Sequence, residues 1–142
     1  GDPQIAQMYQ CHLRGFSPSA TITIAYMRHQ KNKVTLDRKT AARRSLLANL
    51  AESLVLYEKI KTTKAKAKAL APFIARLITK AKMQNLTGRR ELMKTLYTEN
   101  VIKKMMEVIG PKYKERAGGY TRIIMLRNRK GDGAEEVLIE LV

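Results

Sequence analysis

The chain is poor in the residues from which disulfides, metal centres and most catalytic sites are built. It contains one cysteine (Cys11), two histidines (His12 and His29) and no tryptophan among 142 residues. A single cysteine excludes an internal disulfide, and zinc sites that combine cysteine with histidine need at least two cysteines. The sequence therefore predicts no metal ion and no cofactor, and an enzyme is the least favoured class of protein.

Catalytic and phosphate-binding motifs are missing as well. The glycines of Gly88-Arg89-Arg90 and Gly131-Asp132-Gly133 lack the spacing and the Lys-Ser/Thr pair of a phosphate-binding loop. No His-Glu-x-x-His motif occurs, and nothing around Ser45 or Ser53 indicates a catalytic nucleophile. We therefore expect no small-molecule substrate.

Long apolar runs and acidic residues are also scarce. No apolar stretch reaches the roughly 18 residues that a transmembrane helix requires, so no membrane partner is expected. Only 12 Asp and Glu stand against 28 Lys and Arg, which gives a net charge of +16. Such an excess repels itself unless a polyanion neutralises it, and the expected partner is a nucleic acid or another anionic surface.

The positive charge is unevenly distributed, and it divides the chain. Residues 27–68 hold twelve Lys and Arg against three acidic residues. Residues 1–26 show no sustained helical period, and we interpret them as a disordered or non-native extension, with Met27 as a plausible native start. The alternative is an arm that becomes ordered on a partner. We expect a basic RNA-binding arm at 27–39 and a single domain at 40–142.

Helical periodicity dominates the middle of the chain. Asp37 is the expected N-cap of a helix that ends near Tyr57, and Thr62 or Thr63 is the expected cap of a helix that ends near Lys82. Pro72 predicts a kink or break in that second helix. Two more helices are expected at 89–97 and 99–108, after a turn at Asn85–Gly88 and before a stop at Gly110-Pro111. The predicted apolar faces are Leu46, Leu47, Leu50, Leu54 and Tyr57 in the first helix, and Ala65, Ala69, Phe73, Leu77, Ile78 and Ala81 in the second.

The end of the chain changes to a period of two, which is typical of strands. Residues 120–127 and 137–142 flank the turn sequence NRKGDG and predict an antiparallel hairpin. A hairpin alone is marginally stable, so the short segment 58–62 is expected to join it as a third strand. The predicted fold is α+β, with several helices packed on one face of a small, mainly antiparallel three-stranded sheet.

Cations on the predicted elements form three candidate RNA-binding groups. In the first helix they crowd the N-terminal turns, where the helix dipole disfavours them, and an external anion explains them. The alternative is an ordinary solvated basic face. This first group consists of Arg28, His29, Lys31, Lys33, Arg38, Lys39, Arg43 and Arg44.

The second and third groups lie at a predicted helix start and in a glycine-containing loop. The helix start offers hydroxyl groups and backbone N–H groups to a phosphate, and the loop glycines let the backbone approach a polyanion closely. Tyr113 and Tyr120 can stack on unpaired bases, or they can be core residues. The second group is Lys61, Thr62, Thr63, Lys64, Lys66 and Lys68. The third is Lys112, Tyr113, Arg116, Gly118, Gly119, Tyr120, Thr121 and Arg122, to which the hairpin turn adds Arg129 and Lys130.

Several segments together resemble a known family. They are Met27-Arg28-His29, RRSLLANL at 43–50, IKTTKAKAKAL at 60–70, GGYTRI at 118–123, the Lys130-Gly131-Asp132 turn and the closing IELV at 139–142. In this order they resemble the bacterial-type large-subunit ribosomal protein number seventeen, over residues 27–142.

The resemblance implies a structural protein of the large ribosomal subunit that binds large-subunit rRNA. It also implies a position near the exit of the nascent-peptide tunnel, neighbouring large-subunit proteins as partners, and a monomer within a cytoplasmic or organelle ribosome. The competing hypothesis is a free basic nucleic-acid-binding protein, such as a nucleoid or regulatory factor. That class more often shows a dimerisation seam or a groove-reading helix, and neither is evident here.

Overall fold

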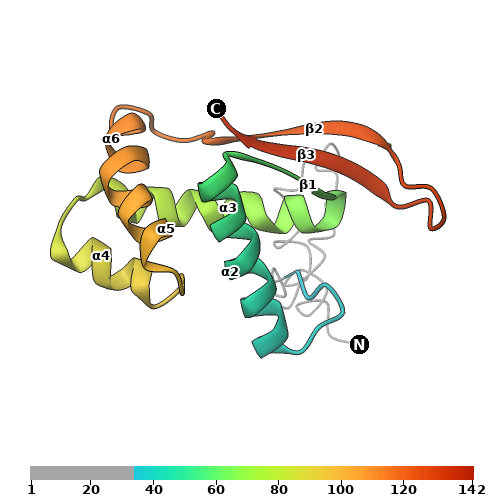
Figure 1. Cartoon of the computed structure of the whole chain (residues 1–142), viewed down its shortest axis with the longest axis horizontal. Coiled ribbons are helices and arrows are strands. Elements are labelled where there is room, and N and C mark those ends of the chain that lie inside the picture. Colours follow the sequence, from blue (N-terminus) through green and yellow to red (C-terminus); the bar gives the residue numbers. More distant parts are fainter. Residues whose placement is uncertain (1–33) are drawn as a thin grey trace, which may run out of the picture. The chain divides into compact units, whose positions relative to one another are not determined.

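A three-stranded antiparallel sheet lies over a layer of helices in the computed structural model, which describes residues 34–142 (Figure 1). The predicted extension at 1–26 and residues 27–33 of the predicted arm lie outside the described residues. The division at residues 26 and 39 therefore stays a prediction. The elements in chain order are α2 (Thr40–Tyr57), β1 (Lys59–Thr63), α3 (Lys64–Lys82), α4 (Leu86–Met93), α5 (Glu99–Lys104), the π-helix η1 (Met105–Ile109), α6 (Gly110–Lys112), β2 (Thr121–Asn128) and β3 (Glu135–Leu141).

The sheet confirms the predicted hairpin and its third strand. Its order is β1-β3-β2, and both neighbouring pairs are antiparallel. Val137 and Ile139 are fully buried because they point from the central strand β3 towards the helices. The hairpin extends past the helical layer (Figure 1), and large apolar side chains of β2 such as Ile124 and Met125 are exposed. The α+β class with helices on one face of the sheet is confirmed.

The first helix ends at Tyr57 as predicted, but its start was predicted wrongly. Its N-cap is Lys39, which makes no side-chain hydrogen bond to the helix end. Asp37 has a φ of 49° and lies before the helix, so its carboxylate does not serve as the cap. The start of α2 therefore carries no side-chain cap and no acidic residue in its first turn.

The second long helix runs unbroken from Lys64 to Lys82. Of the predicted kink or break near Lys68–Pro72, the break is therefore wrong. Pro72 is exposed, and the helix passes through it between the buried residues Leu70 and Ile74. Burial of this face against α2 and the sheet outweighs the local cost of the proline, which amounts to about 3 kcal/mol in an isolated helix. Thr63 is the N-cap, without a side-chain hydrogen bond.

Two glycines that the sequence marks as a turn and a stop instead lie inside helices. Gly88 is in the first turn of α4, whose N-cap Asn85 accepts a hydrogen bond from the Gly88 N–H. A Cβ at Gly88 would lie 2.7 Å from the backbone oxygen of Lys80, and one at Gly110 would lie 2.9 Å from that of Ala81. Glycine is present at both positions because the backbone of α3 passes so close. The predicted stop at Gly110-Pro111 is wrong, and the predicted turn lies between Lys82 and Leu86, before Gly88.

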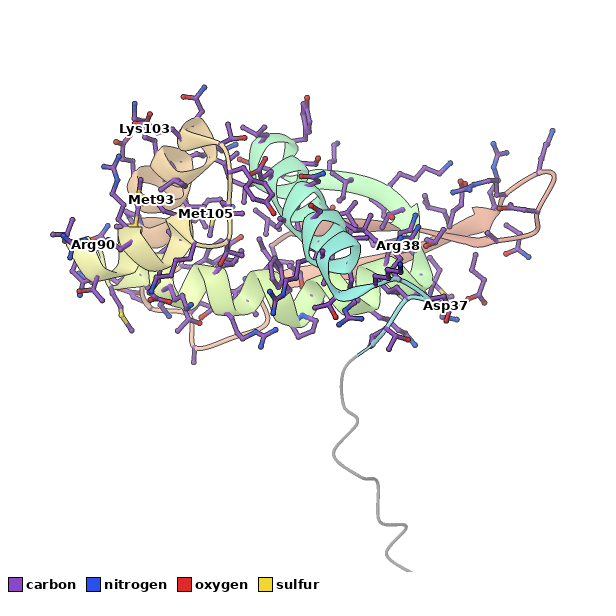
Figure 2. The ribbon with its side chains drawn as sticks, turned by 90° about the horizontal axis from the view of Figure 1, so that it is seen from below. Asp37, Arg38, Arg90, Met93, Lys103 and Met105 are labelled. Atoms are coloured by element: carbon purple, nitrogen blue, oxygen red, sulfur yellow. The ribbon has the colours of Figure 1, made fainter. Side chains whose placement is uncertain are left out.

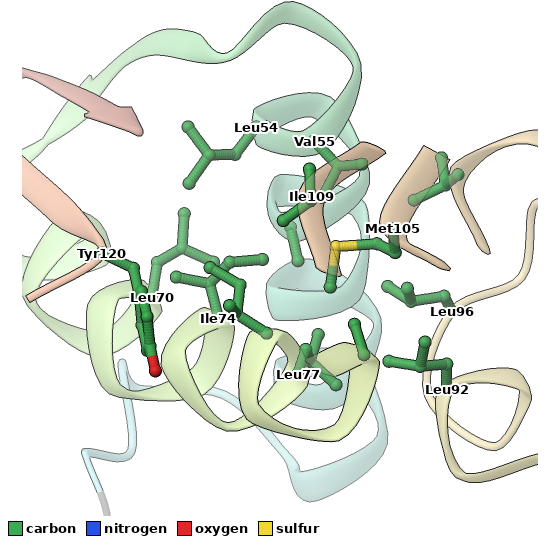
Figure 3. Packing of buried hydrophobic residues seen from close by; sticks show 14 of the residues in the cluster. Leu54, Val55, Leu70, Ile74, Leu77, Leu92, Leu96, Met105, Ile109 and Tyr120 are labelled. Atoms are coloured by element: carbon green, nitrogen blue, oxygen red, sulfur yellow. The ribbon is translucent and has the colours of Figure 1, made fainter. Parts of the chain in front are cut away.

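One hydrophobic cluster joins the helices to Val137 and Ile139 of the sheet. Figure 3 shows some of its helical members, among them Leu54, Leu70, Ile74, Leu92 and Met105. The face of α2 is rotated from the predicted one: Leu54 is buried, whereas Tyr57 is exposed. Leu46, Leu47 and Leu50 are half-buried, and Ala48, Ala51 and Val55 fill the core instead. On α3, Ala69, Leu77, Ile78 and Ala81 are buried as predicted, Phe73 is half-buried, and the predicted core residue Ala65 is exposed.

Candidate nucleic-acid interface

Ion pairing inside the protein separates the predicted RNA-binding cations into two kinds. Four of them lie against carboxylates: Lys61 at Glu136, Lys64 at Glu135, Arg122 at Glu140, and Arg129 at Glu136 and Asp132. A cation already paired with a carboxylate releases fewer counterions from RNA when it meets a phosphate. The remaining predicted cations form no ion pair within the described part of the chain: Arg38, Lys39, Arg43, Arg44, Lys66, Lys68, Lys112, Arg116 and Lys130.

The start of α2 gathers four of these unpaired cations. Arg38 and Lys39 precede the helix, and Arg43 and Arg44 lie in its first turns. The Nη1 of Arg38 donates to the Leu36 carbonyl at 3.0 Å, and that of Arg43 donates to the Arg38 carbonyl at 3.3 Å. A guanidinium has five N–H donors, so each arginine keeps most of its donors for a phosphate. Arg28, His29, Lys31 and Lys33 lie outside the described residues, and their role stays a prediction.

The junction of β1 and α3 is less open to RNA than the sequence indicates. Thr62 is 9% exposed and lies on β1 opposite the buried Val137, on the face of the sheet that meets the core. Thr63 is half-buried at the helix start. Lys61 pairs with Glu136 and Lys64 pairs with Glu135, both on β3. Lys66 and the exposed Lys68 are therefore the unpaired cations of this group.

The loop between α6 and β2 holds its tyrosines in the core. Tyr113 and Tyr120 are 2% and 3% exposed, and their rings pack edge to face with centroids 5.3 Å apart. A buried ring offers no face to a base, so burial supports the interpretation as core residues over stacking. Lys112 lies 5.3 Å from the centroid of the Tyr113 ring, a cation–π contact.

Arg116 helps to hold the same loop together. It donates to the carbonyls of Gly118 and Val142, while its own carbonyl accepts from Lys82 at 2.7 Å. Gly118 and Gly119 are exposed, and a Cβ at either would meet no atom within 4 Å. The loop is therefore open to a polyanion on its outer side, and Thr121 is half-buried where the strand begins.

Ion pairs connect the hairpin turn to the outer face of the sheet. Hydrogen bonds from Lys61 and then Arg129 lower the pKa of Glu136 from its ordinary value, so the carboxylate stays ionised. Arg129 in turn has its pKa raised by Glu136 and Asp132. Lys130 is exposed at the turn. Lys61 and Arg129 thus neutralise a shared carboxylate, and Lys130 is the cation that the turn leaves unpaired.

Sequence reasoning missed a pocket beside the cationic start of α2. Its volume is about 340 Å³, and it lies between α2, Phe73 of α3 and the segment that joins α4 to α5. Arg43 and Arg44 line one side, and Lys94 and Tyr97 line the other. The sequence marks Tyr97 only as the end of a predicted helix, and no spacing pattern links it to Arg44.

Cationic side chains also project from the helices at the far side of this layer. Figure 2 shows Arg90 on α4 and Lys103 on α5 pointing outward, away from Arg38 at the start of α2. Lys103 pairs with Glu99 on its own helix, whereas Arg90 has no ion pair among residues 34–142. Four unpaired cations thus lie at the start of α2, and others lie elsewhere, including Lys66 and Lys68 on α3 and Lys112 and Arg116 around the end of α6.

The side chains of the described residues offer no cluster of metal ligands. No group of three or more His, Cys, Asp or Glu side chains that could hold a metal ion occurs in residues 34–142. None of the helices in that range is long and apolar enough to span a bilayer.

Comparison with known proteins gives one consistent result. The family model described as "Ribosomal protein L17" matches residues 46–142. A relative from Solibacter usitatus is 47% identical over 116 residues, which cover 82% of this chain and 77% of the relative. A relative from Hydrogenobaculum sp. is 44% identical over 117 residues, which cover 82% of this chain and 99% of the relative. Both relatives carry the name "Large ribosomal subunit protein bL17".

Proposed function

The chain belongs to the ribosomal protein L17 family, and from this premise we propose that it is a structural constituent of the large ribosomal subunit that binds large-subunit rRNA. Its role is to neutralise phosphates where rRNA segments pack together and so to hold these segments in place. A net charge of +16 on 142 residues supplies the electrostatic driving force for this role.

The observation that carries the proposal is the cluster of unpaired cations at the start of α2. A helix start normally gains stability from acidic residues and a capping side chain. Here the first turn has neither, and Arg38, Lys39, Arg43 and Arg44 stand in their place. Local stability does not explain this arrangement, whereas an anion supplied by rRNA does, because it would contact the guanidinium groups and the dipole of the helix together.

A binding role fits this surface better than a catalytic one. Its chemistry consists of guanidinium and ammonium groups, which hold phosphates but do not supply a nucleophile with an adjacent base. We propose that the protein is not an enzyme and needs no cofactor.

The partners follow from the same premise. They are large-subunit rRNA and neighbouring large-subunit proteins, with a single copy of this chain in each ribosome. The family resemblance of residues 27–142 supports a position near the exit of the nascent-peptide tunnel as part of the proposal.

Sedimentation of a cell lysate tests the proposed function. The protein is expected to migrate with the large subunit through a sucrose gradient at moderate salt, and to be released when the rRNA is digested. A protein that stays at the top of the gradient, or that migrates with chromosomal DNA, would favour the alternative of a free nucleic-acid-binding factor.

A further inference from the structure

We propose that the pocket beside the start of α2 takes one unstacked nucleotide of the rRNA, with the base on Tyr97 and the phosphate on Arg44. This inference rests on the proposed function and adds a specific site to it. The pocket has a volume of about 340 Å³, at the lower end of the roughly 300–1,000 Å³ found for small-molecule sites.

The lining of the pocket combines the two surfaces that a nucleotide needs. Leu47 and Phe73 are half-buried and form an apolar floor. Tyr97 is 68% exposed, so a large part of its ring is open to a ligand. Unpaired RNA bases stack on aromatic rings and on the planes of guanidinium groups. A ring beside two arginines therefore favours a base with its own phosphate over a purely apolar ligand.

The charges in the pocket differ in how free they are to bind a phosphate. Lys94 pairs with Glu91 at 2.7 Å, and hydrogen bonds from Lys94 and then Lys80 lower the pKa of Glu91. Lys94 is therefore less free to bind a phosphate than a cation without a carboxylate partner. Arg43 gives one of its N–H groups to the Arg38 carbonyl. Arg44 is exposed and has no ion pair within residues 34–142. Arg44 is thus the main phosphate ligand, with the remaining donors of Arg43 beside it.

Glu52 fixes the wall of the pocket that carries Tyr97. Its Oε1 accepts hydrogen bonds from the backbone N–H groups of Tyr97 at 2.6 Å and Thr98 at 3.1 Å. Its Oε2 accepts from the Thr98 hydroxyl at 2.9 Å. Because Glu52 is on α2, these bonds tie the segment after α4 to the helix that bears Arg44. The two halves of the site are therefore held together before RNA binds.

The exposed Tyr57 provides a matched control for Tyr97. Tyr57 ends α2, is 71% exposed and lies outside the pocket. Tyr97→Ala keeps the backbone N–H that binds Glu52, and Tyr57→Ala changes an exposed side chain. We therefore expect neither substitution to unfold the protein. With the full chain and a transcript of large-subunit rRNA, Tyr97→Ala is expected to weaken binding roughly 5- to 150-fold with an unchanged salt dependence, because one base no longer stacks. Tyr57→Ala is expected to stay within about twofold of the unchanged protein, as for a surface position outside the site.

Fluorescence reports the stacking directly, because the sequence contains no tryptophan. In Tyr97→Trp the single indole is expected to be quenched by the rRNA transcript, and much less by a fully paired RNA duplex, which offers no unstacked base. Tyr57→Trp is expected to respond to neither RNA. Equal binding losses for the two alanine variants, or equal quenching by duplex and transcript, would overturn the site while leaving rRNA binding intact. Absence of any rRNA binding by the unchanged protein would instead overturn the proposed function and this site with it.

Discussion

Gly88 lies where α4 approaches the backbone of α3, so Gly88→Ala is expected to destabilise the protein although alanine is the better helix former. The added Cβ would lie 2.7 Å from the Lys80 carbonyl oxygen and 3.1 Å from Oδ1 of Asn85. Ordinary contacts of a Cβ are 3.4–4 Å. The Lys80 oxygen belongs to the backbone and cannot swing away, so α4 has to move.

The size of the change in stability follows from one stabilising and two destabilising contributions. Helix propensity favours alanine over glycine by about 1 kcal/mol. Overpacking costs about 1–3 kcal/mol, and disturbing the cap that Asn85 forms on the Gly88 N–H at 2.7 Å costs about 1 kcal/mol more. The free energy of unfolding should therefore fall by about 1–3 kcal/mol. Movement of α4 also displaces Lys94 and Tyr97, so binding at the proposed nucleotide site should weaken too.

Urea unfolding followed by circular dichroism measures this change, with Gly118→Ala as the matched control. A Cβ at Gly118 meets no atom within 4 Å, and Gly118 is not among the residues with positive φ. The control should be neutral or stabilised by up to about 1 kcal/mol, because alanine restricts the unfolded chain. If Gly88→Ala were as stable as Gly118→Ala, the close approach of α4 to α3 and the role assigned to this glycine would be refuted.

Two further predictions concern the core and the outer face of the sheet. Ile74→Ala should lower the free energy of unfolding by about 2–5 kcal/mol and Leu50→Ala by less, because Ile74 is fully buried and Leu50 is only half-buried. Urea titration of both variants shows which one loses more stability. Glu136 has a pKa held below its ordinary 4.5 by Lys61 and Arg129, so its contribution to stability is complete above that pH and is lost as the pH falls below it. Glu136→Gln should flatten this acid-side loss in melting curves between about pH 6 and pH 3, and an unchanged pH profile would contradict the ion-pair geometry.

The hairpin was predictable because its signals are local. Alternating apolar residues on both sides of the NRKGDG turn leave one antiparallel pairing that buries Val137 and Ile139 together. The ends of α2 at Tyr57 and of α3 at Lys82 follow from helical periodicity in the same way. The third strand could be predicted because a two-stranded hairpin needs additional cover.

The glycines and the start of α2 were not predictable from local patterns. Gly88 and Gly110 look like helix breakers, and only the neighbouring backbone of α3 shows why a side chain is excluded there. Asp37 has the right chemistry for a cap, but it adopts a left-handed conformation before the helix begins. Pro72 is tolerated because the core on both sides of it outweighs the local penalty.

The sequence could indicate which cations are candidate RNA ligands, but not which of them are already paired with carboxylates. The sequence identifies Lys61 and Arg122 as RNA ligands, and only the strand register reveals that Lys61 meets Glu136 and Arg122 meets Glu140. Burial of Tyr113 and Tyr120 could not be separated from stacking, because a tyrosine fits either role. The pocket residue Tyr97 was missed because its neighbours in space are far apart in sequence.

The salt dependence of rRNA binding tests the central claim, that unpaired cations at the start of α2 bind rRNA phosphates. Two double variants remove the same net charge: Arg43→Ala with Arg44→Ala, and Lys61→Ala with Arg122→Ala. Filter binding to a large-subunit rRNA transcript over a range of salt concentrations gives the slope of log K against log salt for each. We expect the first variant to reduce this slope by roughly 1.4–1.8, about 0.7–0.9 for each phosphate that is no longer neutralised. The second variant should change the slope by less than about half as much. Equal reductions in the two variants would show that net charge alone drives binding and would contradict the assignment of the interface to α2.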